Sequence, residues 1–157
     1  MPYNDQYLLS QWEQRITDYI RTIPHDVDDA SHDFFHFQRV WKVACQLMEK
    51  ESEPVNALVV LAACYFHDIV VVPKNSPLRS QASTLAAEKT KQCLHDLSFP
   101  EALIADVCHA VRAHSFSAGI PPETLEAKIV QDADRMEALG AMGLARCFYT
   151  GLSLIHI

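Results

Sequence analysis

The chain has 157 residues, a length typical of one compact domain, and 49% of them are hydrophobic, which is enough for one core. Thirteen Lys and Arg against 20 Asp and Glu give a formal net charge of −7, which argues against a protein that binds duplex nucleic acid through its phosphates. The four glycines form neither GxGxxG nor GxxxxGK[ST], which excludes a glycine-rich phosphate loop.

The cysteine pattern and the length of the apolar runs predict the cellular location of the protein. The five cysteines are odd in number and contain no CxxC pair, so we expect buried thiols of a reducing compartment rather than disulfides or a zinc ribbon. Residues 1–12 lack the basic flank and apolar run of a secretory signal. The longest apolar run, residues 57–66, is shorter than the roughly 20 residues that cross a bilayer. We therefore predict a cytoplasmic protein with no membrane partner.

Apolar residues recur at helical spacing along nearly the whole chain. In chain order, a first helix carries Leu8, Trp12, Ile16 and Ile20 and ends before Pro24. The acidic residues of 26–31 can cap a second helix that runs to about residue 50. A third helix, over about residues 55–69, is apolar almost all round and is expected to be central and buried.

Three more helices are predicted in the second half of the chain. They cover about residues 80–96, residues 101–113 after Pro100, and residues 125–149. Gly140 and Gly143 in the last of them would permit close packing at a cost in helix propensity. The predicted fold is all-α, a compact bundle of about six helices without an internal repeat.

His67 and Asp68 are the strongest chemical signal, because they end the most apolar helix. A buried ionisable pair is costly unless a partner satisfies it, and a divalent cation would do so. The alternative is a histidine that only caps the carboxyl end of its own helix. The pair alone does not decide between these interpretations.

Two other segments also contain histidine or aspartate residues that could ligate a metal ion. His36 lies near the start of the second helix, with His32 one turn earlier on the same face. Asp132 and Asp134 stand within the otherwise apolar last helix, where Asp is a poor helix former. If these carboxylates face inward, they need a positively charged partner.

The stretches HDFFHFQRVWKVA, ACYFHDIV and IVQDADRMEALGAMGLAR resemble the HD superfamily of metal-dependent phosphohydrolases, and within it a bacterial YedJ-like subfamily. The resemblance extends over about residues 29–148 and implies a helical domain built around a divalent metal site. It also implies that this chain, residues 1–157, is a single HD-type domain that lacks carboxyl-terminal helices found in relatives, because the similarity fades after Phe148.

The resemblance implies four metal ligands: His36, His67, Asp68 and Asp134. Asp134 is preferred over Asp132 because it precedes a basic residue in an Ala-Asp-Arg sequence, as the distal ligand does in HD proteins. Two imidazoles and two carboxylates suit Mn²⁺, Fe²⁺, Ni²⁺, Co²⁺ or Mg²⁺, and the sequence does not choose among them.

The implied reaction is hydrolysis of a phosphate monoester or anhydride of a small molecule, with a nucleotide favoured on family grounds. Metal-activated water would attack phosphorus, and Asp68 would orient that water. Arg39 and Lys74 are the candidate contacts for the phosphate oxygens. The sequence leaves the oligomeric state open.

Other activities are also compatible with this ligand set. Related HD proteins include nucleoside triphosphate pyrophosphohydrolases and cyclic-nucleotide-type phosphodiesterases. A non-catalytic metal- or ligand-sensing module and a plain helical interaction domain are the alternatives of another class.

The other histidines have separate expectations. His114 is a candidate for a second metal or for phosphate as much as for ordinary packing, whereas packing is the expectation for His109. His32 is expected to steady a ligand.

Overall fold

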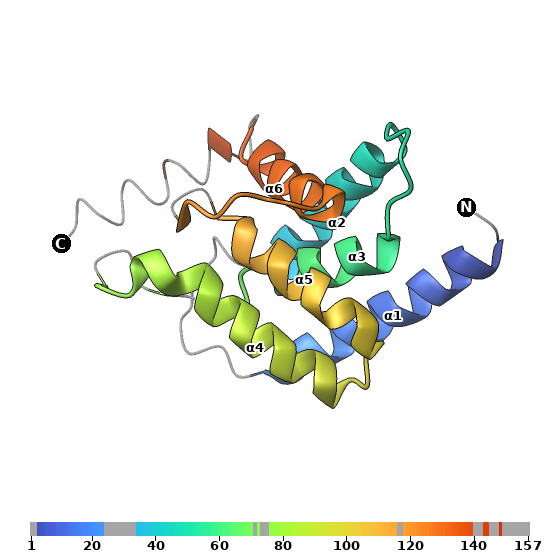
Figure 1. Ribbon diagram of the computed structural model, residues 1–157, viewed down its shortest axis with the longest axis horizontal. Helices are drawn as coiled ribbons and strands as arrows, with labels where there is room; N and C mark the ends of the chain where they lie inside the picture. The colour runs from blue at the N-terminus through green and yellow to red at the C-terminus, as the bar shows by residue number, and fades with distance from the viewer. Residues whose placement is uncertain are drawn as a thin grey trace.

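The computed structural model describes residues 3–23, 34–70, 72, 76–115, 118–139, 143–144 and 148, and within them it contains helices and no strand (Figure 1). The elements are α1 (Tyr3–Thr22), α2 (Phe34–Met48), α3 (Ala57–Phe66), the short 3₁₀ helix η2 (Arg79–Gln81), α4 (Ala82–Asp96), α5 (Glu101–Ala113) and α6 (Leu125–Glu137). The predicted all-α fold with six helices is confirmed.

Two helices end earlier than their apolar patterns predict. Helix α3 ends at Phe66, so His67 takes the capping position and Asp68 lies in the turn that follows. Helix α6 ends at Glu137, and the amide of Leu139 closes a tight turn onto the carbonyl of Met136 at 3.0 Å. The poor helix propensity of Gly140, the next residue, is consistent with this early end. Of residues 140–149, which were predicted to continue this helix, Gly143, Leu144 and Phe148 are helical and the others lie outside the described residues.

Helix α3 is the centre of the molecule. All ten of its residues are buried, and it packs against α1, α2, α4, α5 and α6. Asn56 fixes where it starts, because its side chain accepts hydrogen bonds from the amides of Leu58 and Val59. None of the described helices, α3 included, is long and apolar enough to span a membrane.

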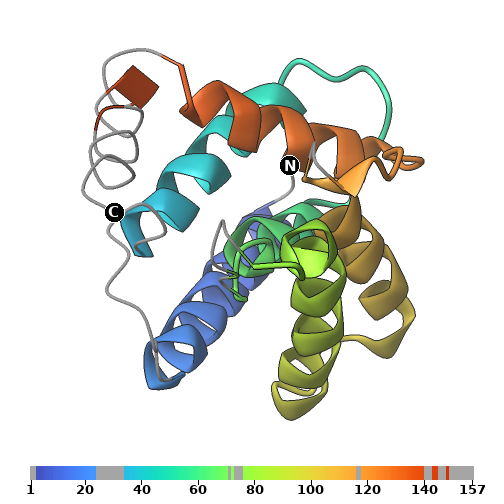
Figure 2. The same ribbon diagram turned by 90° about the vertical axis from the view of Figure 1, so that its left-hand side faces the viewer.

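The other helices surround α3 in two groups. Helices α2 and α6 pack against each other and lie together across the top of Figure 2, while α1, α4 and α5 extend below them. Helix α5 contacts α4, α3 and α6 and so links the groups. This arrangement brings the start of α2, the ends of α3 and α5, and the second half of α6 to one region.

The α4–α5 connection ends α4 with a Schellman turn. Ser98 adopts a positive φ of 51°, and the amide of Phe99 reaches back to the carbonyl of Leu94 at 2.9 Å. The amide of Ser98 bonds the carbonyl of His95 at 2.9 Å. This turn reverses the chain and allows α5 to pack against α4.

Candidate metal centre

Four helices deliver histidine and aspartate side chains to one buried place. His36 lies in the first turn of α2, His67 and His114 occupy the capping positions at the ends of α3 and α5, and Asp134 projects from α6. The three histidines are buried. Buried imidazoles and carboxylates are stable only when they are paired with one another or with an ion.

His36, His67 and Asp134 form the first cluster. The Nε2 atoms of His36 and His67 are 3.2 Å apart. The Oδ1 atom of Asp134 lies 3.5 Å from the Nε2 of His36 and 3.6 Å from the Nε2 of His67. The three potential ligand atoms therefore converge on one point, from helices far apart in the sequence.

His67 also belongs to a second cluster, with Asp68 and His114. The two carboxylate oxygens of Asp68 face different histidines: Oδ2 lies 3.7 Å from the Nε2 of His67, and Oδ1 lies 3.4 Å from the Nε2 of His114. In each cluster the potential ligand atoms all lie within 4.8 Å of one another. The Nε2 of His67 is the atom that the two clusters share.

This donor set fits a divalent transition-metal ion. Metal–nitrogen and metal–oxygen bonds of about 2.1 Å place neighbouring ligand atoms about 3 Å apart, close to the separations found here. The Asp68 and Asp134 side chains are 25% and 26% exposed, while those of His36 and His67 are fully buried. Solvent can therefore reach the cluster from the carboxylate side.

Two of the histidines are oriented by their own helices. The Nδ1–H of His67 faces the carbonyl of Cys64 at 2.9 Å, and the Nδ1–H of His114 faces the carbonyl of Val111 at 2.6 Å. Carbonyl oxygens only accept hydrogen bonds, so each Nδ1 donates and each Nε2 is left to face the cluster. The negative ends of two helix dipoles, those of α3 and α5, also favour a cation there.

The electrostatics of the cluster are those of a cation site. Burial acts to lower the pKa of His67, but the negative charges of Asp68 and Asp134 outweigh it and raise the pKa from 6.5 to about 9. Burial would raise the pKa of Asp134, but the imidazoles of His36 and His67 beside its carboxylate hold it well below its usual range. A divalent ion would take the place of the proton that these carboxylates hold on His67.

Glu137 is a residue of this region that the sequence analysis did not single out. It is the last residue of α6 and is only 7% exposed. Its Oε2 lies 3.3 Å from the Nδ1 of His36, and its Oε1 accepts a hydrogen bond from the Nε of Arg39 at 2.5 Å. Its spacing from Asp134, one helical turn, was the signal that could have found it.

The structure brings together the four predicted ligands, His36, His67, Asp68 and Asp134, and adds His114. Asp132, the carboxylate that was set aside, is exposed on the other side of α6. The other predicted phosphate contact, Lys74, and also His32, lie outside the described residues. His109 is turned elsewhere: its Nε2 accepts a hydrogen bond from the amide of Glu123 at 3.0 Å.

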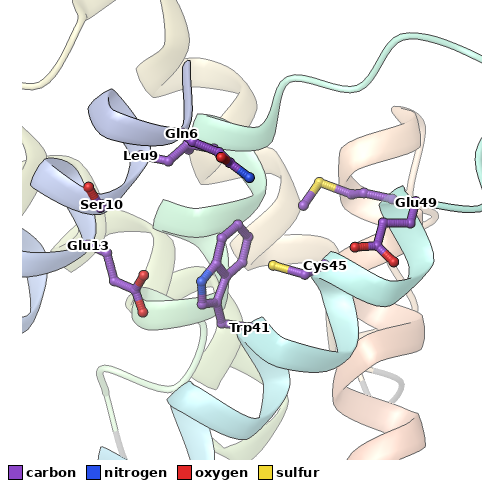
Figure 3. Close-up of a pocket in the computed structure, with 8 residues that line it drawn as sticks. Gln6, Leu9, Ser10, Glu13, Trp41, Cys45 and Glu49 are labelled. Carbon is purple, nitrogen blue, oxygen red and sulfur yellow. The ribbon is translucent and has the colours of Figure 1, made fainter. Parts of the chain in front are cut away.

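A separate cavity lies between α1 and α2. It has a volume of about 450 Å³, and none of the candidate ligands lines it. Figure 3 shows Trp41, Cys45 and Glu49 on the side of α2 and the turn after it, with Glu13 of α1 on the opposite side. This cavity is therefore distinct from the metal centre.

Comparison with known proteins agrees with this geometry. The chain is 31% identical over 144 residues to the uncharacterized protein YpgQ of Bacillus subtilis, and the match covers 89% of this chain and 66% of YpgQ. The chain therefore spans slightly less than two thirds of that relative. The HD domain model matches residues 34–139.

Two solved structures share the fold. A predicted HD superfamily hydrolase from an uncultured Thermotogales bacterium aligns with a TM-score of 0.65 at 29% identity, covering 87% of this chain and 74% of that one. A Lactobacillus plantarum protein aligns with a TM-score of 0.69 at 27% identity, covering 90% of this chain and 63% of that one. Because the HD domain model matches more than half of the 157 residues, this protein belongs to the HD domain family.

Proposed function

We propose that this protein is a metal-dependent phosphohydrolase that cleaves a phosphate monoester or anhydride of a small molecule, with a nucleotide as the favoured substrate. The observation that carries the proposal is the convergence of His36, His67 and Asp134 on one point, with Asp68 beside them. Family membership and the likeness to a predicted HD hydrolase support the reaction class. The preference for a nucleotide rests on the family resemblance alone.

Each side chain has a role in this proposal. His36, His67, Asp68 and Asp134 hold the ion. When bound, a divalent ion supplies a water of lowered pKa and polarises the phosphoryl group. Asp68 is partly exposed, and its carboxylate can orient the attacking water and accept its proton.

The phosphate must also meet positive charge from the protein. Arg39 lies on α2 one turn after His36, and its side chain is one third exposed. A planar guanidinium suits phosphate oxygens because it offers parallel N–H donors. We assign Arg39 and Lys74 to this contact.

A substrate screen tests the proposal. The purified chain is incubated with nucleoside mono-, di- and triphosphates, cyclic nucleotides and sugar phosphates, in the presence of Mn²⁺, Co²⁺, Ni²⁺ or Mg²⁺ in turn. We expect hydrolysis that EDTA abolishes and that Asp68→Ala and Asp134→Asn reduce by more than about 100-fold. The position of the cleaved bond separates a phosphomonoesterase from a pyrophosphohydrolase or a phosphodiesterase.

Asp132→Asn is the matched control, because it removes an exposed carboxylate from the same helix. It should leave turnover within about twofold of the unmodified chain. Hydrolysis that survives both chelation and Asp68→Ala would contradict the mechanism. Tight metal binding without turnover on any substrate would instead indicate the non-catalytic sensing module.

A further inference from the structure

We propose that Glu137 is a positioning residue that fixes the ring orientation and tautomer of His36, with Arg39 as its anchor. The proposal deepens the proposed function and rests on it in one respect, that His36 is a metal ligand.

The two oxygens of Glu137 have different partners. Oε2 lies 3.3 Å from the Nδ1 of His36, on the side of the ring that faces away from the metal cluster. Oε1 accepts the hydrogen bond from the Nε of Arg39. The other ring nitrogen of His36, Nε2, faces His67 and Asp134. His36 is thus held between a carboxylate on one side and the cluster on the other.

The tautomer follows from this arrangement. The Glu137 carboxylate is paired with the Arg39 guanidinium, and carboxylate oxygens accept hydrogen bonds. A neutral His36 ring faces two carboxylates, and Glu137, 3.3 Å from Nδ1, is nearer than Asp134, 3.5 Å from Nε2. A proton on Nδ1 leaves the lone pair of Nε2 to face an ion. A proton on Nε2 would make the same nitrogen unable to ligate.

The start of α2 explains why His36 needs a partner from another helix. His67 and His114 stand at carboxyl ends of helices, where backbone carbonyls of the same helix accept from Nδ1. His36 is in the first turn, where the free backbone groups of a helix are N–H donors rather than acceptors. Glu137 of α6 supplies the acceptor that α2 does not offer at this position.

Arg39 is the counter-ion of the buried Glu137 carboxylate. His36 and Arg39 are one turn apart on α2, and Asp134 and Glu137 have the same spacing on α6. The two helices pack against each other, so each pair faces the other across the contact. A carboxylate that is only 7% exposed needs such a counter-ion, since an unpaired buried charge is costly.

The test compares three variants of the full chain. Glu137→Met keeps the side-chain length and removes the acceptor, Glu137→Gln keeps an accepting oxygen, and Asp132→Asn controls for loss of a carboxylate on α6. Two readouts are used: the His36 tautomer of the metal-free protein from long-range ¹H–¹⁵N spectra, and Co²⁺ affinity by chelator competition together with the Co²⁺ absorption spectrum. Circular dichroism establishes that each variant is folded.

We expect the Nδ1–H tautomer of His36 in the unmodified chain and in Asp132→Asn. In Glu137→Met, the Nε2–H form should appear, because Nε2 can then donate to Asp134, and Co²⁺ affinity should fall by about 10- to 100-fold with a changed absorption spectrum. Glu137→Gln should recover most of the affinity.

The proposal is overturned if folded Glu137→Met keeps both the tautomer and the Co²⁺ affinity of the unmodified chain. It is also overturned if Glu137→Gln is as defective as Glu137→Met, since the acceptor oxygen would then not be what matters. An unmodified chain that takes up no Co²⁺ would contradict the proposed function, while the tautomer readout would still decide the role of Glu137.

Discussion

Cys45 is a half-buried residue on α2, at the wall of the α1–α2 cavity. Burial, with added repulsion from Glu13 and Glu49, raises the pKa of its thiol from 9.0 to about 11. Since only the thiolate reacts, its fraction at pH 8 is about 100-fold smaller than for a thiol of pKa 9.0. We predict correspondingly slow alkylation of Cys45 by iodoacetamide, measured by peptide mass spectrometry from pH 8 to 11.

Glu49→Gln provides the comparison for Cys45. Glu49 is exposed, and its removal takes away one source of repulsion, so the alkylation profile should shift to lower pH. The apolar surroundings of Cys45 stay the same in this variant. A Cys45 that reacts as fast as free cysteine at pH 8 would be at odds with the environment described for α2.

The sequence singled out most residues of the candidate metal centre but not Glu137, which contacts His36. His36, His67, Asp68 and Asp134 were assigned through resemblance to a family, and the structure places them together. The sequence does not distinguish Glu137 from a surface residue, because an acidic residue on a helix is usually solvated. Only the packing of α6 on α2 reveals that this carboxylate is buried against His36.

At the scale of elements, Ser98 is a target for stabilisation. Its φ of 51° lies in the left-handed region, which costs a residue with a Cβ about 1–2 kcal/mol. Glycine adopts this conformation freely but loses more backbone entropy on folding. We predict that Ser98→Gly raises the free energy of unfolding by about 0.5–1 kcal/mol, measured by urea denaturation.

Ser98→Ala is the matched control, because it removes the hydroxyl and keeps the Cβ. It should give no gain in stability. An equal gain from both variants would mean that the hydroxyl, rather than the backbone conformation, limits stability at this turn.

Gln131 ties α6 to the end of α5. It is buried, and its side-chain amide donates to the carbonyl of Ala113 at 2.7 Å, next to His114. Gln131→Leu would leave that carbonyl without this donor, at a cost of about 1–3 kcal/mol in the free energy of unfolding. Denaturant unfolding measures this loss, and Asp132→Asn, on the exposed side of α6, should change stability by less than about 0.5 kcal/mol.

Helix cores were easier to predict from sequence than helix ends. The ten buried residues of α3 form an unmistakable apolar run. The pattern continues through Ile69, but the helix ends at Phe66, and this places His67 and Asp68 in the turn. Hydrophobic periodicity reports burial, and apolar residues that follow a helix, such as the partly buried Ile69, extend the same pattern.

At the scale of the whole molecule, metal binding should be visible as thermal stability. An ion that binds only the folded chain adds about 2.7 kcal/mol at a concentration 100 times its dissociation constant. For a chain of this size the expected rise in Tm is about 5–10 °C. Thermal unfolding with Co²⁺ or with EDTA measures it, and Asp134→Asn should lose most of the rise.

The rise in Tm caused by a bound metal ion should depend on pH. The proton on His67, whose pKa is raised to about 9, stabilises the metal-free fold fully below pH 6.5, and this stabilisation is lost as the pH rises through 9. A metal ion must displace that proton. The rise in Tm caused by Co²⁺ should therefore be larger at pH 8.5 than at pH 6.5, and the opposite trend would indicate that His67 is not a ligand.

Sequence patterns predicted the helical class but not the neighbours of each helix. Amphipathic spacing shows which face of a helix is buried, whereas the choice of partner depends on the shapes of the packed surfaces. That α2 packs chiefly against α6 and α3 emerges only in three dimensions. The prediction of a single HD-type domain over residues 1–157 remains a prediction.

The contact between Arg39 and Glu137 joins residues 98 positions apart in the chain. Loop-closure entropy opposes such a distant pairing, so it should form late during folding and be among the first contacts to open. Separation of α6 from α2 would carry Asp134 away from His36 while the contacts of α3 with α1, α2 and α5 remained. A bound Co²⁺ ion would then dissociate before the chain unfolds globally. Loss of the Co²⁺ absorption spectrum would therefore report the onset of unfolding.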